Sequence, residues 1–166
     1  MLMDDQKFRT IIENADSRAF DALSESDKED FMLTLMYDFI SLKKLSEMNE
    51  VQKTLYLAVK LEDTCQADGL PSLSEDEEIW KALPEIEEAY RRLGAAKTAE
   101  CIREFISLLP EGGVPEWEWF FESESAGTVK ALDRKISDYP DGAMSSLYIK
   151  FLSENDNAAK AFMNLQ

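Results

Sequence analysis

The sequence predicts an all-α protein, a compact single-domain bundle of about seven to nine helices that spans residues 1–166. Three observations predict this class. Apolar residues recur along most of the chain at the three- and four-residue spacing of amphipathic helices. Residue types that start or stop helices punctuate this pattern. The chain also has only six glycines and five prolines, which leaves little of the turn chemistry that a many-stranded β fold needs.

Three helices are expected in the first third of the chain, each with its own start signal. Asp4 can cap the first helix. Ser26 and Glu29 form a capping box before the second, in which the serine oxygen accepts a free backbone N–H and the glutamate reaches back. Asn49 starts the third, which ends at the turn over 68–71 because that turn contains glycine and proline. The apolar residues expected to face the core are Phe8, Ile11, Ile12, Phe31, Leu35, Phe39, Leu42, Val51, Leu55, Ala58, Val59, Leu61 and Cys65.

The middle of the chain continues the helical pattern. A second capping box, Ser74 with Glu77, precedes another apolar stripe. Pro84 lacks an N–H, so it either kinks this helix or begins a new one. The stripe runs to Gly94, a residue type common just past a helix end. Residues 96–109 give the cleanest amphipathic pattern of the chain. The aromatic residues expected in the core of these helices are Trp80, Tyr90 and Phe105.

Further helices are expected over 129–139, over 143–152 and from Asn155 to the end. The segment 116–122 is ambiguous, because its aromatic residues group at the strand period of two as well as at the helical period of 3.6. Pro115 favours a helix start. We therefore expect a short helix here, with a strand as the alternative.

Acidic residues dominate the charge of the chain. There are 34 Asp and Glu against 18 Lys and Arg, which gives a net charge of −16. Residues 61–128 hold 17 acidic and five basic residues, a net charge of −12, whereas 1–60 carry −4 and 129–166 are neutral. A surface of this sign repels nucleic acid and anionic lipid and attracts basic partners. We therefore expect no direct binding to nucleic acid or membrane, and a basic protein as partner.

The residue types also limit the chemistry. Histidine is absent, which excludes His-based acid–base catalysis, His-activated nucleophiles and metal sites that need imidazole. No phosphate-binding glycine loop or G-x-S-x-G nucleophile motif occurs. Cys65 and Cys101 form no metal-binding pair, and we expect them to be buried free thiols. No apolar run has the length of a membrane span, and the first residues lack a signal-peptide pattern. The expectation is a cytoplasmic protein that is not an enzyme and has no metal or cofactor.

The candidate site residues are acidic and aromatic. Acids at a helix start are explained by the helix dipole, but this accounts for only part of the cluster at 75–78. The helix dipole does not explain the glutamates over 85–88 or the acids around 116–122. We expect these acids either to bind a partner or to form a solvated face. Aromatic side chains rimmed by acids are typical of an interaction surface. The predicted partner-binding residues are Glu75, Asp76, Glu78, Glu85, Glu88, Trp117 and Trp119.

Several short stretches between about residues 50 and 155 form a recognisable set. They are Leu61-Glu62, Asp68-Gly69-Leu70, Leu93-Gly94-Ala95, Thr98 to Ile102, Leu108-Leu109-Pro110, and Leu132-Asp133 with Ile136 and the 147–152 stretch. Together they resemble the DNA-mimic protein family, an all-helical family mostly of unknown function. The family's Asn-Asn-Gly-Gly-Phe-like turn stands here as residues 66–70, which keep only the second glycine. The resemblance implies a helical fold and, from the named member, an acidic surface that imitates DNA and occupies a DNA-binding protein.

These observations lead to one functional expectation and two alternatives. The expected function is that of a non-catalytic acidic interaction protein, which binds a basic, DNA-binding protein partner as a DNA mimic. The first alternative is an immunity or antitoxin-type protein that neutralises a toxin. The second is a small enzyme that uses carboxylates alone, which requires a deep pocket lined by two or more acids. A homodimer is compatible with the sequence.

Overall fold

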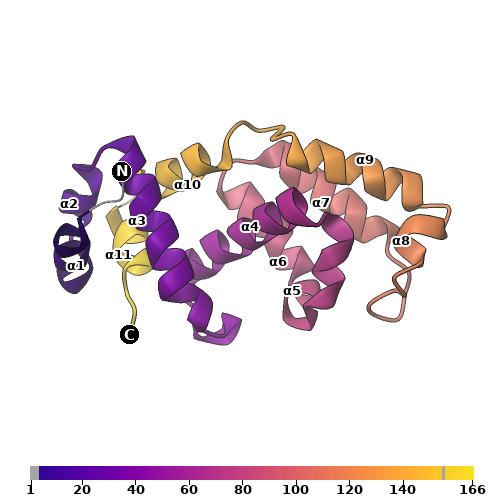
Figure 1. Cartoon of the computed structure of the whole chain (residues 1–166), viewed down its shortest axis with the longest axis horizontal. Helices are drawn as coiled ribbons and strands as arrows, with labels where there is room; N and C mark the ends of the chain where they lie inside the picture. The colour runs from indigo at the N-terminus through magenta and orange to yellow at the C-terminus, as the bar shows by residue number, and fades with distance from the viewer. Residues whose placement is uncertain (1–3, 155) are drawn as a thin grey trace. The chain divides into compact units, whose positions relative to one another are not determined.

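The computed structural model describes residues 4–154 and 156–166, and all regular secondary structure among them is helical (Figure 1). This confirms the all-α class. The described residues form eleven α-helices and three short 3₁₀ helices. Among the described residues, three of the α-helices have five residues or fewer, and so the longer ones match the expected seven to nine.

The chain forms two compact units. Unit 1 comprises Met1–Tyr56 and Ser145–Gln166, and unit 2 comprises Leu57–Met144. The helix α4 (Glu50–Ala67) contributes its first residues to unit 1 and the rest to unit 2. The single domain over 1–166 stays a prediction.

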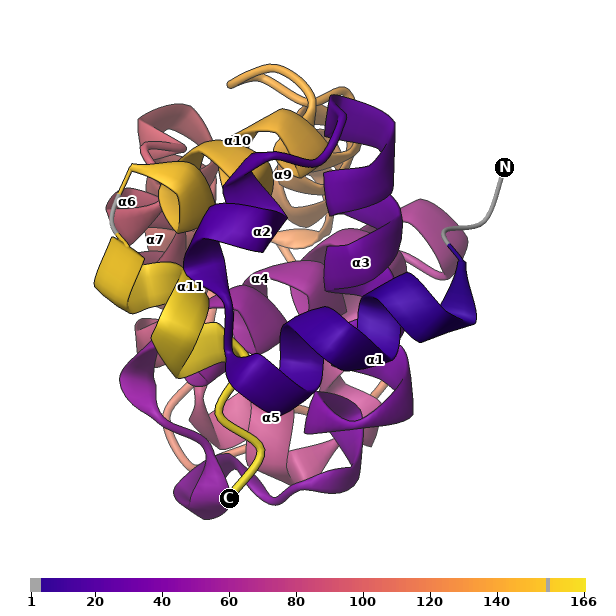
Figure 2. The same ribbon diagram turned by 90° about the vertical axis from the view of Figure 1, so that its left-hand side faces the viewer.

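Unit 1 brings the two ends of the described chain into one core. Its further elements are α1 (Asp5–Asn14), α2 (Ser17–Asp21), α3 (Glu25–Asp38), η1 (Ile40–Leu42), η2 (Leu45–Glu47), α10 (Met144–Ser153) from its second residue on, and α11 (Asp156–Phe162). Helix α2 packs against both α1 and α11 (Figure 2). The rings of Phe20 and Phe31 meet at 5.4 Å in this core, and Phe162 is buried beside them.

The expected start of α4 is confirmed, and the residues that form it also hold the C-terminal segment. Asn49 accepts the N–H of Gln52 through its side chain, and the Gln52 side chain accepts the N–H of Asn49 in return. The amide of Asn49 also donates to the Ala161 carbonyl at 2.7 Å. Gln52, almost fully buried, donates to the carbonyls of Phe162 and Asn164. One capping box therefore satisfies backbone groups of two segments that lie far apart in the sequence.

Two other helices of unit 1, α1 and α3, begin at side-chain caps. Asp4 accepts the N–H of Gln6, which confirms it as the first cap. The capping box of Ser26 with Glu29 is wrong, because Ser24 accepts the N–H of Asp27 and α3 begins two residues earlier. Serine at 24 has the extended backbone that a cap needs, whereas Ser26 is already helical. The helix start expected at Asn155 lies outside the described residues.

The end of α3 overturns two core predictions. Phe39 is 42% exposed and Leu42 is 80% exposed. Both were expected on the buried stripe of a helix that continues past residue 38. The α-helix ends at Asp38, and the chain then tightens into η1, so the helical spacing no longer points these side chains inward.

Unit 2 contains the rest of α4 and a set of helices wrapped around α7. Its elements are η3 (Leu70–Glu75), α5 (Glu77–Lys81), α6 (Leu83–Arg92), α7 (Ala96–Leu108), α8 (Trp119–Glu122) and α9 (Ala126–Ser137). Helix α7 packs on both α6 and α9, while α8 packs on α9. Helix α5 contacts η3 and α6.

The helix boundaries of unit 2 settle the alternatives around Pro84. This proline lies in the first turn of α6, so it begins a new helix instead of kinking the preceding one. Gly94 is confirmed just past the end of α6, with φ +79°. Its N–H and that of Ala95 bond the carbonyls of the last turn at 3.0 and 2.8 Å, the Schellman arrangement. The capping box of Ser74 with Glu77 is wrong, because Asp76 accepts the N–H of Ile79 and caps α5.

The start of α7 is capped by a carboxylate from a distant turn. Asp141 accepts the N–H of Lys97 at 3.0 Å, and the N–H and hydroxyl of Thr98 at 2.7 Å each. Burial acts to raise the pKa of this carboxyl, but the bonds from Thr98 and Lys97 outweigh it, so the pKa of Asp141 lies below its ordinary value. The turn after α9 is thereby attached to the first turn of α7.

Replacing Asp141 by asparagine tests this cap. At pH 7 we expect Asp141→Asn to lower the free energy of unfolding by about 1–2 kcal/mol, because the anionic acceptor of three donors is lost. A depressed pKa stabilises the fold above the unfolded value, near 3.9, and this stabilisation disappears as the pH falls through the folded value. Urea unfolding followed by circular dichroism should therefore show the two chains converging below about pH 4.

Asp138→Asn is the matched control, since Asp138 is an exposed acid next to the same turn. Its unfolding should resemble that of the unchanged chain at every pH. An effect of Asp141→Asn that persists undiminished into acid would contradict a role for the carboxylate charge.

Candidate functional site

The site is organised around a buried tryptophan. Trp80 on α5 is 7% exposed, and its ring stands edge-on to Phe105 of α7 and to Phe120 of α8, with centroid distances of 6.1 Å in both pairs. Such edge-to-face contacts are the favoured arrangement of aromatic rings. Phe105 and Phe120 are themselves buried, which confirms the core role of Trp80 and Phe105. The contacts bring α5 and α8, both flanked by acidic residues, onto neighbouring parts of unit 2.

Tyr90, the third aromatic residue expected in the core, is confirmed there as well. It is almost fully buried in α6, and its hydroxyl donates to the carbonyl of Ala58 in α4 at 2.8 Å. The bond satisfies the one polar atom that burial of a tyrosine would otherwise leave without a partner.

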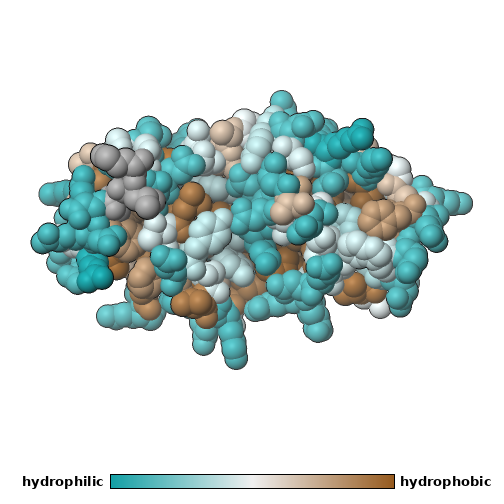
Figure 3. Space-filling view, viewed as in Figure 1, coloured by the Kyte–Doolittle hydropathy of each residue, from teal (hydrophilic) through white to brown (hydrophobic). Residues whose placement is uncertain are grey.

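Residues 111–124, the acid–aromatic segment, expose two aromatic rings. The expected short helix is confirmed as α8 (Trp119–Glu122), preceded by a turn. Trp117 is 45% and Phe121 58% exposed, and their rings lie 5.3 Å apart. Phe120 points into the core, and Trp119 is half-buried against it. In Figure 3 apolar atoms lie at the surface over α8, among hydrophilic ones.

The exposed pair differs from the pair that was predicted. The sequence predicts Trp117 and Trp119 as partner-binding residues, whereas the structure exposes Trp117 together with Phe121 and leaves Trp119 half-buried. These two residues are four apart, the spacing of neighbours on one helix face. That spacing was the signal which could have found Phe121.

The glutamates of the acid–aromatic segment are unneutralised. The segment contains no lysine or arginine, and its acids are exposed. Within the described part of the chain, none of their carboxylates forms a hydrogen bond or an ion pair. These residues are Glu111, Glu116, Glu118, Glu122 and Glu124.

Several acids of α5 and α6 are instead engaged with the chain's own residues. Asp76 caps α5 and lies 4.0 Å from the Lys60 ammonium. Glu88 is 3.3 Å from Arg92, one turn further along α6. Glu87 pairs in the same way with Arg91, which also contacts Glu100. The charge of this stretch is thus partly neutralised at the surface.

The remaining predicted acids are exposed but do not form one row. Glu75 ends η3, Glu78 lies on α5 and Glu85 lies on α6. Because Pro84 begins a separate helix, Glu78 and Glu85 do not share one helix face. Glu85 and Glu88 lie three residues apart on α6.

The acidic excess belongs mainly to unit 2. Unit 2 carries 20 acidic and nine basic residues, a net charge of −11, while unit 1 has 14 and nine, a net charge of −5. The potential that attracts a cationic molecule is therefore strongest around unit 2.

A groove lies beside the acid–aromatic segment, between the turn before η3 and helices α8 and α9. Its volume is about 490 Å³. Phe120, Phe121 and Val129 supply apolar lining, while Asp68 and Asp133 supply carboxylates. The groove lies within unit 2 and is next to the exposed aromatic pair, because Phe121 belongs to both.

The turn at one side of the groove is fixed by Asp133 of α9. This carboxylate accepts the N–H of Leu70 at 2.9 Å. Gly69 has φ +89°, and a Cβ there would lie 3.0 Å from the Asp133 carboxylate. Burial, reinforced by Asp133, raises the pKa of the Cys65 thiol, which keeps it protonated and inert. Cys65 and Cys101 are both buried free thiols, as expected.

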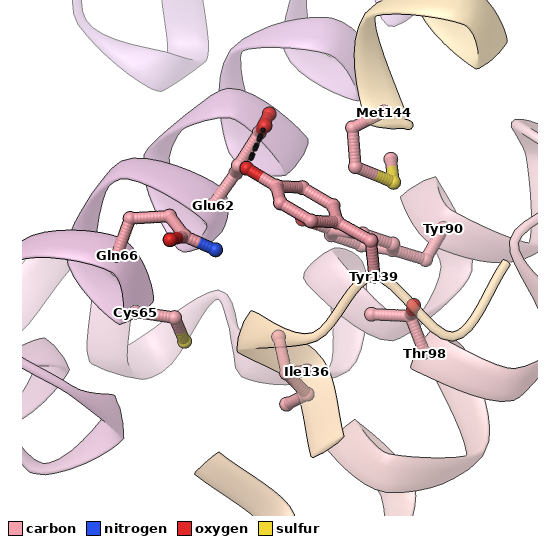
Figure 4. A pocket seen from close by; sticks show the side chains of 8 residues that line it. All are labelled: Glu62, Cys65, Gln66, Tyr90, Thr98, Ile136, Tyr139 and Met144. Atoms are coloured by element: carbon pink, nitrogen blue, oxygen red, sulfur yellow. Dashed lines mark hydrogen bonds between the residues drawn. The ribbon is translucent and has the colours of Figure 1, made fainter. Parts of the chain in front are cut away.

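A second, smaller hollow has no room for a ligand. Its lining residues come from α4, α6, α7, α9, the turn after α9 and the first residue of α10 (Figure 4). The hydroxyl of Tyr139 donates to Glu62 at 3.0 Å across it (Figure 4). Burial and this bond, with the charges of Glu62 and Asp63, raise the pKa of Tyr139 to about 12. The volume of about 10 Å³ corresponds to at most one water molecule.

Two further properties follow from the described residues. No helix among them combines the length and apolarity needed to cross a bilayer. No cluster of three or more Cys, Asp or Glu side chains in the described part of the chain is arranged to hold a metal ion.

Fold and surface together define an all-helical, strongly acidic protein with an exposed acid–aromatic segment. The family model described as DMP19-like protein matches residues 46–155, and the chain belongs to this family. The matched residues include the stretches between about 50 and 155 that carry the resemblance to an all-helical family. No curated protein and no solved structure matches the chain significantly.

The structure gives physical roles to the stretches that carry the resemblance. Asp68-Gly69-Leu70 and Leu132-Asp133 meet through the bond between Leu70 and Asp133. Leu93-Gly94-Ala95 forms the Schellman end of α6. These stretches therefore hold the fold of unit 2, and the acids and aromatic residues are displayed on it.

Replacing Gly69 by alanine tests the packed turn. Gly69→Ala should lower the free energy of unfolding by at least about 1 kcal/mol more than Gly94→Ala does. Both positions have positive φ, which strains an alanine at either one. The strain is larger at 69, because Gly69 also has ψ 166°, a combination that essentially only glycine adopts. Only the methyl group at 69 meets Asp133, since nothing lies within 4 Å of a Cβ at 94. Equal losses in urea unfolding would show that the turn is not packed as described.

Proposed function

We propose that this protein binds a basic, DNA-binding protein through the acid–aromatic segment, as a non-catalytic mimic of the DNA backbone. The observation that carries the proposal is that one segment displays the contacting rings of Trp117 and Phe121 together with five exposed glutamates, which have no partner among the residues that the structure describes. The membership in the DMP19-like protein family is compatible with this role.

Electrostatics supports a cationic partner. Exposed carboxylates without internal partners repel one another, and a partner that supplies cations relieves this repulsion. Glu118 and Glu122 are four residues apart at α8, where a helix rises about 6 Å. Phosphates follow one another about every 3.4 Å along one strand of duplex DNA, so two steps span a similar distance.

The aromatic pair supports a protein rather than a small cation as the partner. Trp117 and Phe121 present apolar area beside the charges, and tryptophan is enriched among the residues that dominate binding energy at interfaces. Removing this area from water gives affinity that salt does not screen, whereas the glutamates give attraction that salt does screen.

The salt response tests the proposal. Immobilised protein is incubated with lysate of its source cells at about 50 mM salt, and retained proteins are identified by mass spectrometry. We expect basic DNA-binding proteins to be retained, to elute by about 200 mM salt and to be displaced by duplex DNA. Retention that neither salt nor duplex DNA affects would overturn mimicry.

A matched pair of variants assigns the binding to the segment. The triple variant Glu116→Gln, Glu118→Gln and Glu122→Gln raises the net charge by three. So does the control Glu13→Gln, Asp21→Asn and Asp38→Asn, which changes exposed acids of unit 1. We expect the first variant to lose most of the retained partner and the second to keep it. Equal losses would mean that net charge alone, and not this segment, is responsible.

The second candidate function is that of an immunity or antitoxin-type protein. The exposed aromatic pair favours this function, because a mimic of the DNA backbone needs only negative charges and the backbone has no groups that correspond to these rings. Such a protein covers the active site of a toxin, so the retained partner would be an enzyme that the chain inhibits. Duplex DNA would then fail to displace the partner, although salt would still weaken retention.

A further inference from the structure

The groove beside the acid–aromatic segment combines an apolar wall with acidic ends. Phe120, Val129 and the exposed ring of Phe121 line it, together with the acidic residues Asp68 of the turn and Asp133 of α9. Lys130 is the basic residue among its lining groups. The volume of about 490 Å³ exceeds what one extended side chain needs.

The carboxylates of Asp68 and Asp133 differ in their exposure and in the bonds that they already accept. Asp68 is exposed, and its carboxylate has no ion pair within the described part of the chain. Asp133 is half-buried, accepts the N–H of Leu70 with one oxygen, and also bonds the Cys65 thiol. A carboxylate offers about four acceptor positions, so Asp133 can accept further donors while it holds the turn. The exposed ring of Phe121 can also attract a cation through a cation–π interaction.

Charge complementarity selects the occupant. Arginine and lysine have apolar stems and cationic heads, and their stems bury against apolar surface while the heads stay polar. Unit 2 carries a net charge of −11, which raises the local concentration of cations and lowers that of anions. Lys130 and the positive N-terminal end of α9 instead attract anions. A change at Lys130 can therefore test whether the groove binds a cation or an anion.

We infer that this groove is the subsite for an arginine or lysine side chain of the basic partner. The stem lies against Phe120, Phe121 and Val129, and the cationic head lies between Asp68 and Asp133. The inference rests on the proposed function, because it names what the partner inserts next to the acid–aromatic segment. It also adds this chain's Asp68-Gly69-Leu70 turn to the binding surface, through Asp68.

The test uses a defined probe and the full chain. The probe is the capped peptide acetyl-Gly-Arg-Leu-Arg-Gly-amide, titrated into ¹⁵N-labelled protein at about 20 mM salt. We expect saturable shifts in the amide resonances of Gly69, Gly127 and Val129. The same peptide with citrulline for arginine keeps the shape without the charge and should bind at least about threefold more weakly. Equal shifts with the citrulline peptide, or stronger shifts with a glutamate peptide, would overturn the subsite.

Reversing the charge of Lys130 gives the sharpest discrimination. Lys130→Glu should tighten binding of the arginine peptide about two- to fivefold, the range that one exposed ion pair supplies. Lys135→Glu on the same helix makes the same charge change outside the groove lining and should have less than half this effect. Weaker binding by Lys130→Glu would show that the groove takes an anion, and an equal gain in both variants would show that only net charge matters.

A third variant tests the aromatic wall. Phe121 is exposed, so Phe121→Ala should leave the fold intact, as the dispersion of the amide spectrum would show. The arginine peptide should bind about two- to fivefold more weakly to it. Unchanged affinity would remove Phe121 from the subsite.

Failure of the subsite and failure of the proposed function have different signatures. If the groove resonances do not respond while partner retention stays sensitive to salt and DNA, the subsite is wrong and the proposed function stands. If the peptide binds in the groove while retention ignores both salt and DNA, mimicry is wrong and the groove remains a cation-binding site of the chain.

Discussion

The burial of Trp80 between Phe105 and Phe120 is the constraint on which the surface of unit 2 depends. It fixes α5 and α8, which are short, through edge-to-face contacts with a buried core. Helices of five and four residues have little stability of their own, so tertiary packing must hold them. Because Phe120 is anchored in this way, Trp117 and Phe121 on the same short segment are left facing solvent.

The acids of unit 2 divide into three groups by what they contact. Some serve the fold: Asp76 and Asp141 cap helices, and Asp133 holds the Gly69 turn. Others, such as Glu87 and Glu88 on α6, are paired with arginines one turn away. The glutamates of the acid–aromatic segment do neither. This division explains why most of the recognisable stretches are structural, while most of the charge available to a partner lies in the segment between α7 and α9, with Asp68 beside it in the groove.

The sequence predicted the helical class and most boundaries because apolar periodicity and local start signals report on the same helices. The helix start was predicted wrongly where two neighbouring residues can both cap a helix. Ser24 and Ser26 are both suitable N-cap residues, and only the extended backbone at Ser24 shows that α3 begins there. Phe39 and Leu42 were placed inside because periodicity does not show that α3 ends at Asp38. Long-range contacts, such as Asp141 capping α7 and the groove beside Phe121, leave no local pattern in one sequence.

The central claim is that the glutamates at 116–122 meet a cationic partner directly. Carbodiimide labelling of carboxylates with glycine ethyl ester, read by mass spectrometry with and without the retained partner, tests it site by site. The account predicts that Glu116, Glu118 and Glu122 are labelled in the free protein and protected in the complex, while Glu13 and Asp21 are labelled equally in both. Protection confined to the acids of unit 1, with the segment still labelled in the complex, would contradict it.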